Sequence, residues 1–499
     1  METEQFRQFG KTAIDIIADY YINIRERDVL PSVLPEDFIR LMPENAPESP
    51  EKWQELLEDF QKKVIPAITH WHSPQFHSYF PVGVSLASIV GSLLCSGLGI
   101  KGSTWISSPA CTELEVVVVS WLAKMLGLPE YFQNTAAGPG GGVIQGSASE
   151  STLVCLLAAK HRMLREMKAS NKEIDEDRIK TKFVIYTSDQ SNSSVEKSGV
   201  LGSMITRLLK TDNNGQLRGE TLKKAFENDK SKGLIPCYVV ASYGTTGTCA
   251  FDPIDEIGPI CREEGVWLHI DAAYAGTAFV CPEYRHLMKG IEYVDSFVFN
   301  PHKWMLVNYD CSVLYVKDCF DLIKTFDVKG DIDVNDEKET VFPQYRYWQI
   351  PCSRRFRALK LWIVLKIYGA SGVRDLVRTQ VNLANHFASL VRGDSRLVIE
   401  PEPSMTVVCF RLRKGDFLTE KLLEYLVNQK KIFMVAAIFR NHYVIRMVIC
   451  SQFTTKDDVD RSWNTIQDGV NYVLSHSHRF NHRKSLLTNR RLSLDIERV

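Results

Sequence analysis

The sequence predicts an α/β protein whose main sheet is mostly parallel and buried on both faces. The first observation is that short apolar runs alternate with helical stretches between about residues 110 and 365. Strands and helices that alternate in this way form parallel βαβ units, whose helices cover both faces of the sheet. The apolar runs are KFVIYTS (182–188), LIPCYVVASYG (234–244), VWLHIDAAYAG (266–276) and DSFVFNPHKW (295–304).

The second observation is that this alternation stops beyond about residue 390. The remaining chain reads as a strand at 406–413, a helix at 419–431, strands at 433–439 and 442–450, and a last helix from about 454. This order predicts a small α+β unit. The first hundred residues are instead helical, and their amphipathic start is typical of a docking arm.

The predicted organisation follows from these changes in pattern. We expect a helical docking arm at 1–85, a large α/β domain at 86–365, a small α+β domain at 366–475 and a basic, flexible tail at 476–499.

The composition excludes several classes of function. The chain has 499 residues with 60 basic and 60 acidic side chains, so its net charge does not favour nucleic acid or a membrane surface. The start lacks the apolar segment of a secretory signal, and no run of 18 apolar residues predicts a membrane span. Twelve cysteines lie singly without a C-x-x-C pair, which argues against a zinc cluster or a disulfide framework. We therefore expect a cytoplasmic protein with no metal, no nucleic-acid partner and no membrane partner.

A lysine that follows an apolar run is the first candidate catalytic residue. Lys303 lies in NPHKW, directly after the run that ends at Phe299. A lysine in this place is by itself usually an ordinary loop cation. Between His302 and Trp304, however, it could lose its charge in a desolvated pocket and form a Schiff base with an aldehyde cofactor.

Asp271 in VWLHIDAAYAG is the second candidate. Strand alternation places Trp267, His269 and Asp271 on one face, with Asp271 at the carboxyl end, where open α/β sheets bind ligands. A carboxylate there can keep a pyridine nitrogen protonated, although a helix cap or a turn aspartate is the plain alternative. An aspartate about thirty residues before a lysine, each closing an apolar run, points to pyridoxal 5'-phosphate (PLP).

The third candidate is a helix start that can bind an anion. The segment AAGPGGGVIQGSASES lacks the Gly-Lys-Ser/Thr of a P-loop and shows no preceding strand, so a nucleotide site is not favoured. A clear helix follows, and Ser147, Ala148 and Ser149 place backbone N–H groups and hydroxyls at its N-terminus. Such an end can hold a phosphate, although a serine-rich helix start is more often only a cap.

Taken together, the motifs resemble those of a known enzyme family. The chain contains, in this order, HWHSPQFHSYFP, SPACTELE, GGGVIQGSASES, ASYGTTGT, HIDAAYAG, NPHKW and WQIPCSRRFRALKLW. This set is similar to the PLP-dependent aromatic-L-amino-acid decarboxylases of group II, over about residues 5 to 475. The resemblance implies PLP-dependent transferase fold type I. It also implies that the large domain, 86–365, has a seven-stranded sheet and binds PLP, and that the N-terminal segment, 1–85, is a dimerisation arm that wraps the partner in a homodimer.

The resemblance also assigns roles to individual residues. Lys303 would bind the cofactor as a Schiff base, and Asp271 would pair with its pyridinium nitrogen. The other cofactor-binding positions would be Ser147, Ala148, Ser149, Asn192, Thr246, Asn300 and His302. An aromatic substrate pocket would contain Trp71, Tyr79, Phe80 and Pro81, for which core packing is the plain alternative.

Asn192 departs from the pattern of the ordinary decarboxylases. In them the matching position is a histidine stacked over the cofactor ring, where it helps to position the substrate and to transfer protons. An asparagine amide can cover the ring and form hydrogen bonds, but it cannot titrate near neutral pH. A second departure lies in the polar interval 328–344, a surface loop or active-site lid. The decarboxylases carry a proton-donating tyrosine there, whereas this chain has none between Tyr315 and Tyr345.

These two departures predict a catalytic Asn192 and an oxidative reaction. Without a proton donor, the electron-rich intermediate that remains after loss of CO2 survives longer and can react with O2. Asparagine at this position is the pattern of the insect aromatic acetaldehyde synthases, so the resemblance implies that L-dopa and O2 give 3,4-dihydroxyphenylacetaldehyde, CO2, NH3 and H2O2. The alternatives are a simple decarboxylase that makes dopamine and a catalytically silent PLP-binding paralogue.

Three further departures concern the substrate. The family usually has apolar or aromatic residues at the positions of Lys101 and Ser103, which reach the pocket of the partner subunit. Ser353 stands where many decarboxylases have glycine, and its hydroxyl could select for ring hydroxyls or be a plain loop serine.

Overall fold

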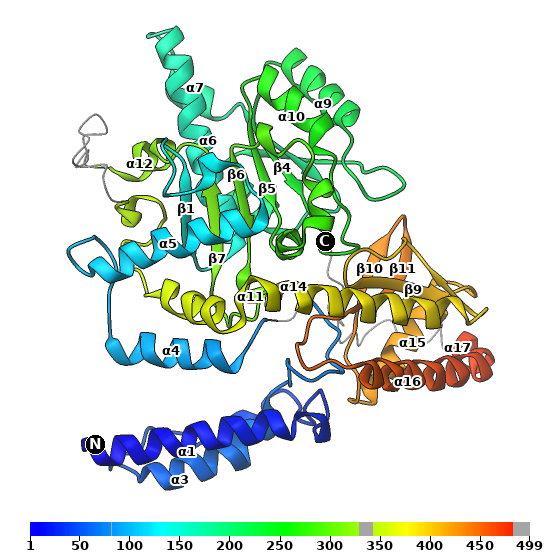
Figure 1. Cartoon of the computed structure of the whole chain (residues 1–499). Coiled ribbons are helices and arrows are strands. Elements are labelled where there is room, and N and C mark those ends of the chain that lie inside the picture. Colours follow the sequence, from blue (N-terminus) through cyan, green and yellow to red (C-terminus); the bar gives the residue numbers. More distant parts are fainter. Residues whose placement is uncertain (81, 329–342, 483–499) are drawn as a thin grey trace.

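The computed structural model describes residues 1–80, 82–328 and 343–482 (Figure 1). Its larger sheet has seven strands in the order β1-β7-β6-β5-β4-β2-β3. The strands are β1 (Gly141–Gln145), β2 (Phe183–Ser188), β3 (Ile205–Leu209), β4 (Ile235–Ser242), β5 (Trp267–Asp271), β6 (Ser296–Phe299) and β7 (Ser312–Val316). All neighbours from β6 to β3 pair in parallel, and only β7 runs antiparallel to both of its neighbours. The predicted α/β class with a mostly parallel seven-stranded sheet is therefore confirmed.

Helices cover both faces of this sheet, as the continuous apolar runs predict. Alternate residues of a strand point to opposite faces, so each strand contributes to two cores. One core includes Val184, Val239 and Ile270 and packs against α5, α10 and α14. The other includes Ile185, Val240 and Trp267 and packs against α6, α8 and α12. Burial on both faces explains why the strands β2, β4 and β5 are almost entirely apolar.

The helices of the two units and the arm have the following bounds. They are α1 (Thr3–Ile22), α2 (Asp37–Leu41), α3 (Trp53–Asp59), α4 (Leu86–Leu98), α5 (Pro109–Leu126), α6 (Ala148–Ser170), α7 (Glu176–Lys180), α8 (Ser194–Leu201), α9 (Gly219–Ser231), α10 (Ile254–Glu263), α11 (Pro301–Trp304), α12 (Phe320–Phe326), α14 (Arg357–Arg392), α15 (Asp416–Asn428), α16 (Lys456–Ser475) and α17 (Ser477–His482). None of the helices in the described ranges combines the length and the apolar character that crossing a membrane requires.

Strand β1 was not predicted, because two of its five residues and the residue on each side of it are glycines. The expectation that no strand precedes the GSASES segment is wrong. A Cβ atom on Gly142 would lie 2.4 Å from Cγ1 of Val119 and 2.7 Å from Cδ1 of Tyr315. The strand therefore needs glycine at this position so that α5 and β7 can pack closely against it.

The smaller sheet is antiparallel, in the order β10-β11-β9-β8. Its strands are β8 (Leu397–Ile399), β9 (Val407–Leu412), β10 (Val435–Phe439) and β11 (His442–Val448). A third core lies between this sheet, α15, α16 and the C-terminal half of α14. Helix α14 extends across the molecule between the two sheets and changes direction at Gly369, where φ is 63° (Figure 1). The predicted domain boundary at 365/366 falls inside this helix, close to the kink.

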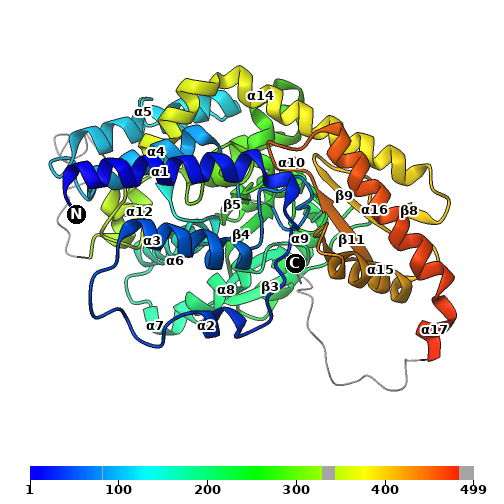
Figure 2. The ribbon, with the colours of Figure 1, turned by 90° about the horizontal axis from the view of Figure 1, so that it is seen from below.

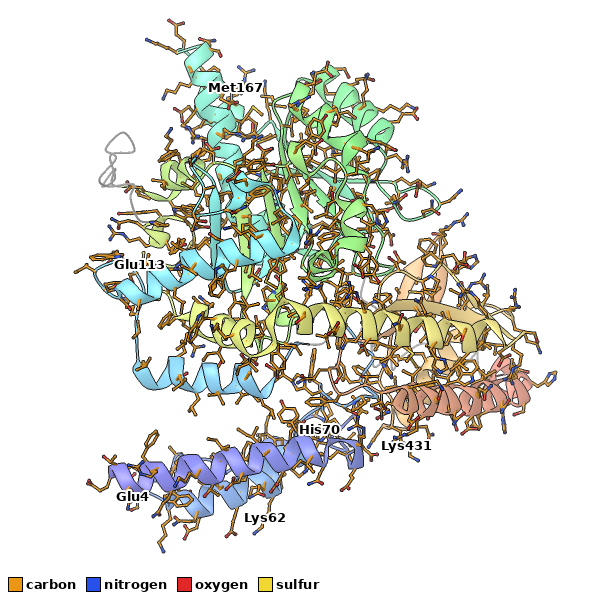
Figure 3. The ribbon with its side chains drawn as sticks, viewed as in Figure 1. Glu4, Lys62, His70, Glu113, Met167 and Lys431 are labelled. Atoms are coloured by element: carbon orange, nitrogen blue, oxygen red, sulfur yellow. The ribbon has the colours of Figure 1, made fainter. Side chains whose placement is uncertain are left out.

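The N-terminal arm lies outside the two sheet units. Figures 1 and 2 show α1 and α3 side by side, and the rings of Phe9 and Trp53 are stacked at 5.5 Å. The chain is then fixed to the smaller unit, because Arg25 forms a salt bridge of 3.0 Å with the buried carboxylate of Asp458. Figure 3 shows Glu4 and Lys62 on the arm, away from the body.

Candidate active site

A cavity of about 210 Å³ opens at the carboxyl ends of the parallel strands. In open α/β sheets this edge is where ligands bind. Strands β4, β5 and β6 contribute their ends, and the N-termini of α6 and α8 face the same space. Nine predicted site residues line the cavity: Ser147, Ala148, Ser149, Asn192, Thr246, Asp271, Asn300, His302 and Lys303. Phe80 also lines it.

Lys303 lies in the one-turn helix α11 that follows β6. The turn is fixed because the Lys303 N–H donates to the Asn300 carbonyl at 2.9 Å, and Asn300 Oδ1 accepts from Ser312 Oγ at 2.7 Å. The Lys303 ammonium nitrogen lies 5.2 Å from the centre of the Phe80 ring. A lysine against an aromatic wall at the end of a buried strand is placed where a covalent amine nucleophile is needed.

Asp271 ends β5 and faces the same cavity. Burial raises the pKa of its carboxyl above the usual range, while the positive charge of Lys303 and the Ala273 N–H act in the opposite direction. The Ala273 N–H donates to Asp271 Oδ1 at 2.9 Å and holds the carboxylate in place. His269 lies on the same face of β5, as predicted, and is bound to Ser296 Oγ at 2.8 Å. A buried carboxylate of this kind gains most from a cationic partner in the cavity.

The N-terminus of α6 forms an anion cradle. Ser147 is the N-cap, and its hydroxyl accepts from the Glu150 N–H at 3.1 Å. Ala148 and Ser149 begin the helix, so their N–H groups have no partner within it. This end of a 23-residue helix therefore presents both N–H donors and the positive end of the helix dipole to the cavity.

Asn192 faces the cavity from the start of α8. Its Nδ2 donates to Thr246 Oγ1 at 3.2 Å, and its Oδ1 accepts from the Ser194 N–H at 3.0 Å. Both ends of the amide are thus engaged, which fixes its orientation at the wall of the cavity. Thr246 belongs to the turn after β4, which Thr245 closes by accepting from the Ala250 N–H at 3.0 Å.

Among the described residues that line the cavity, the histidine and the tyrosine are poor proton donors near neutral pH. His302 is the only imidazole among these residues, and burial together with the charges of Lys303 and Lys360 lowers its pKa to about 3. Its Nδ1 accepts from the Cys311 N–H at 2.8 Å, so the ring is neutral. Burial also raises the pKa of Tyr274 far above its usual value. Neither side chain can relay a proton near neutral pH.

Several predicted substrate residues do not reach this cavity within a single chain. Trp71 stacks on Phe76 at 4.8 Å and on Tyr79 at 5.4 Å, beside the cavity rather than in it. Ser353 is exposed, on the segment before α14. Pro81 and positions 329–342 of the predicted lid lie outside the described residues.

Sequence reasoning missed other residues of the site. Ser194, Ser242, Gly244, Thr245, Ala273 and Tyr274 also line the cavity. Most of them lie in the ASYGTTGT and HIDAAYAG motifs, beside Thr246 and Asp271. Their closeness in sequence to these two predicted residues could have identified them. In the part of the chain that the structure describes, no His, Cys, Asp or Glu side chains cluster in threes so as to hold a metal ion.

The donor set fits PLP. A phosphate needs the cradle at α6, a pyridinium nitrogen needs a carboxylate such as Asp271, and an aldehyde needs an amine such as Lys303. All three occur in the one cavity, with an aromatic wall at Phe80.

Comparison with known proteins agrees with this geometry. Residues 35–413 match the family model of the pyridoxal-dependent decarboxylase conserved domain. The chain is 49% identical to aromatic-L-amino-acid decarboxylase of Drosophila melanogaster, over 93% of this chain and 91% of the relative. It is 45% identical to 3,4-dihydroxyphenylacetaldehyde synthase of Aedes aegypti, over 95% and 91% of the two chains.

Solved structures show the same relationship. The tryptophan decarboxylase of Catharanthus roseus, in complex with L-tryptophan, superposes with a TM-score of 0.90 at 36% identity, over 95% of this chain and 99% of that one. The fold is therefore PLP-dependent fold type I, and PLP is the cofactor. The chain belongs to the group II family of pyridoxal-phosphate-dependent decarboxylases.

Proposed function

We propose that this enzyme converts an aromatic L-amino acid, best L-dopa, into an aldehyde with O2 as co-substrate. The balanced reaction is L-dopa + O2 + H2O giving 3,4-dihydroxyphenylacetaldehyde, CO2, NH3 and H2O2. The observation that carries this proposal is that Asn192 lines the cavity and donates to Thr246 Oγ1; by the resemblance of the sequence it occupies the position of the decarboxylase histidine. Relatives of both kinds lie at similar identity, so overall similarity does not separate the two reactions.

The residues of the chain have separate roles in this reaction. PLP supplies an electron sink for the bond to CO2. Asp271 would hold a proton at the ring nitrogen, Lys303 would bind the cofactor aldehyde, and the start of α6 would hold the phosphate; all three line the cavity. Phe80 forms an apolar wall of the cavity beside Lys303.

The oxidative outcome follows from slow protonation. After CO2 leaves, the α-carbon stays electron-rich until a proton reaches it. Asn192 cannot supply one, and the neutral His302 has its Nδ1 occupied by the Cys311 N–H. Transfer of two electrons to O2 then gives H2O2 and an imine, which water converts to aldehyde and NH3. An aromatic substrate is supported by the names of the relatives and by the aromatic wall.

Product analysis under air and under argon tests this function. With L-dopa under air we expect aldehyde as the main product, with one H2O2 formed for each CO2 released. Under argon the aldehyde should disappear, because no other oxidant is supplied. Tyrosine, tryptophan and 5-hydroxytryptophan, tested in the same way, define the substrate preference.

If dopamine forms in an amount equal to the CO2 released and no oxygen is consumed, the enzyme is a simple decarboxylase. A cofactor absorption band without turnover of any aromatic amino acid would show the silent paralogue.

We further propose that the enzyme is a homodimer. Helix α4 carries an exposed apolar stripe at helical spacing, formed by Leu86, Val90, Leu93, Leu94 and Leu98. The stripe remains exposed in the single chain although α4 lies between α14 and the arm (Figure 1). By the resemblance of the sequence, a second copy that covers it would also bring its Lys101 and Ser103 toward the first copy's substrate pocket.

Charged substitutions test the dimer. Val90→Glu with Leu94→Glu should give monomers, because two buried carboxylates would oppose association. Sedimentation equilibrium measures the mass. Leu208→Glu is the control, since Leu208 is similarly exposed, 49% as for Val90, but lies on the edge strand β3. A dimer that tolerates both changes on α4 would contradict this interface.

We also place the reaction in the cytosol. All twelve cysteines are free thiols, as is usual in a reducing compartment.

A further inference from the structure

Arg446 is a buried arginine that the reaction described above does not use. It lies on β11, its exposed fraction is 0%, and it pairs with Cys409 of β9 and Val435 of β10. Its Nη1 donates to the Tyr79 carbonyl at 2.7 Å. Its Nε and Nη2 have no hydrogen-bond partner among the described residues. Burial of such groups is unfavourable, so the guanidinium requires an explanation.

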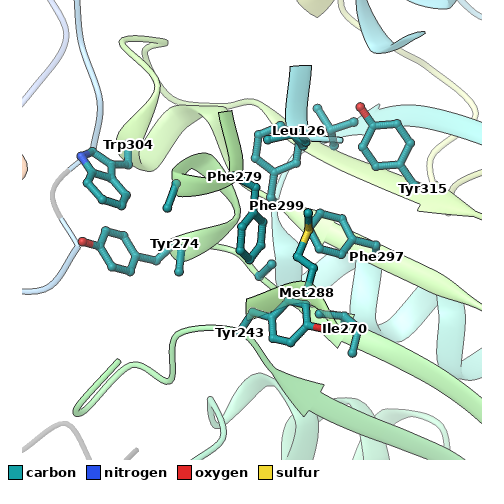
Figure 4. Packing of buried hydrophobic residues seen from close by; sticks show 14 of the residues in the cluster. Leu126, Tyr243, Ile270, Tyr274, Phe279, Met288, Phe297, Phe299, Trp304 and Tyr315 are labelled. Atoms are coloured by element: carbon teal, nitrogen blue, oxygen red, sulfur yellow. The ribbon is translucent and has the colours of Figure 1, made fainter. Parts of the chain in front are cut away.

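The Arg446 guanidinium begins a column of stacked flat groups. Its central carbon lies 4.4 Å from the centre of the Phe80 ring. Phe80 stacks on Tyr274 at 3.8 Å with an interplanar angle of 14°, and Tyr274 stacks on Trp304 at 4.9 Å and 18°. Figure 4 shows Tyr274 and Trp304 side by side at one edge of the main core. The last member of the column is therefore Trp304, which directly follows Lys303 in the chain.

The Tyr79–Phe80 corner needs an external restraint. Tyr79 has a φ of 54°, the left-handed region that non-glycine residues rarely adopt. Such a conformation is strained and persists only where the surroundings enforce it. The hydrogen bond from Arg446 to the Tyr79 carbonyl fixes the corner, and the planar guanidinium covers the face of the next ring.

We propose that Arg446 is a positioning residue, which holds the Phe80 ring as a fixed wall beside Lys303. Arg446 does not line the cavity, whereas Phe80 does, so Arg446 acts through Phe80. Through Phe80, Arg446 couples the position of the smaller sheet to the position of Lys303. This role rests on the decarboxylase chemistry of the family and does not depend on whether the product is an aldehyde or an amine.

The test compares Arg446→Lys with Arg411→Lys. Lysine keeps the charge at 446 but loses the planar fork and the stacking. We expect kcat for CO2 release to fall about 10- to 100-fold, the size of effect that a misplacement of about 1 Å produces. We also expect the circular dichroism of the bound cofactor to change. Arg411 lies on β9 in the same sheet and pairs with Glu400, so Arg411→Lys should leave both measurements unchanged.

A double-mutant cycle with Phe80→Leu tests the path of the effect. If Arg446 acts through Phe80, the double variant should be hardly slower than the slower single variant. Additive losses would overturn the proposal, as would an unchanged kcat and dichroism in Arg446→Lys. If that variant does not fold, Arg446→Gln, which is shorter and neutral, is tested against the same criteria.

Ligand binding separates positioning from direct contact. Dopamine and L-dopa differ in the α-carboxylate, and both can be titrated by the change in cofactor absorbance. A positioning residue should weaken both ligands equally when it is replaced. A loss confined to L-dopa would show that Arg446 binds the carboxylate directly and would overturn the proposal. Because CO2 release is common to both candidate reactions, none of these results depends on the oxygen step.

Discussion

The Asn192→His variant should release mainly amine instead of aldehyde. Asn192 lines the cavity and donates to Thr246 Oγ1, and an imidazole in its place keeps a ring nitrogen within reach of the same hydroxyl. With an unperturbed pKa of about 6.5, it can deliver the proton that asparagine cannot. Because general acid catalysis contributes roughly 10²–10⁴-fold, the amine-to-aldehyde ratio should rise by roughly 10²-fold.

The ratio should also depend on pH. The protonated imidazole is the donor, so the amine share should increase as pH falls through about 6.5 and decrease above it. Chromatography of both products, with oxygen uptake recorded in parallel, measures the ratio. Asn192→Gln is the matched control, because it retains an amide and should retain the aldehyde. If the ratio is unchanged in Asn192→His, the 328–344 loop rather than Asn192 determines whether amine or aldehyde is formed.

Lys303→Ala should abolish turnover and the absorption band of the bound cofactor. Alanine has no amine with which to bind the aldehyde, so covalent catalysis is lost and kcat should fall by at least about 10³-fold. Absorbance spectra of the purified variant and CO2 release with L-dopa measure the two effects.

Lys360→Met is the control for Lys303→Ala. Lys360 is a buried lysine on α14 whose Nζ donates to the Asn308 carbonyl at 2.9 Å, and it does not line the cavity. Its loss should lower stability by about 1–3 kcal/mol while the band remains. A Lys303→Ala protein that kept both the band and full turnover would contradict the assigned role.

Local patterns predicted the parts of the site that lie at element ends. Asp271 and the turn that contains Lys303 each follow an apolar run, and parallel strands bring such ends to one edge. Ser147 could be placed because a helix start has its own local signature.

The rest of the site depends on contacts between distant segments. Arg446 lies 367 residues from Tyr79 in the chain, and the run HYVIRMVIC reads as any small-sheet strand. Nothing in the sequence of this run indicates that Arg446 contacts Tyr79 and Phe80. The same reason explains β1, whose glycines have a low strand preference: Gly142 is required by the side chains of α5 and β7, and Gly141 lies against the side chain of Asn134.

Helix α14 has a consequence for how the molecule loses its structure. Its first half packs in the core of the large sheet and its second half in the core of the small one. Within it, Gln380 accepts from Trp304 Nε1 and donates to the Ser451 carbonyl at 2.9 Å. Unfolding of either core would therefore disrupt α14, which the other core requires. The two should therefore unfold as one cooperative unit, and PLP bound at one sheet protects both.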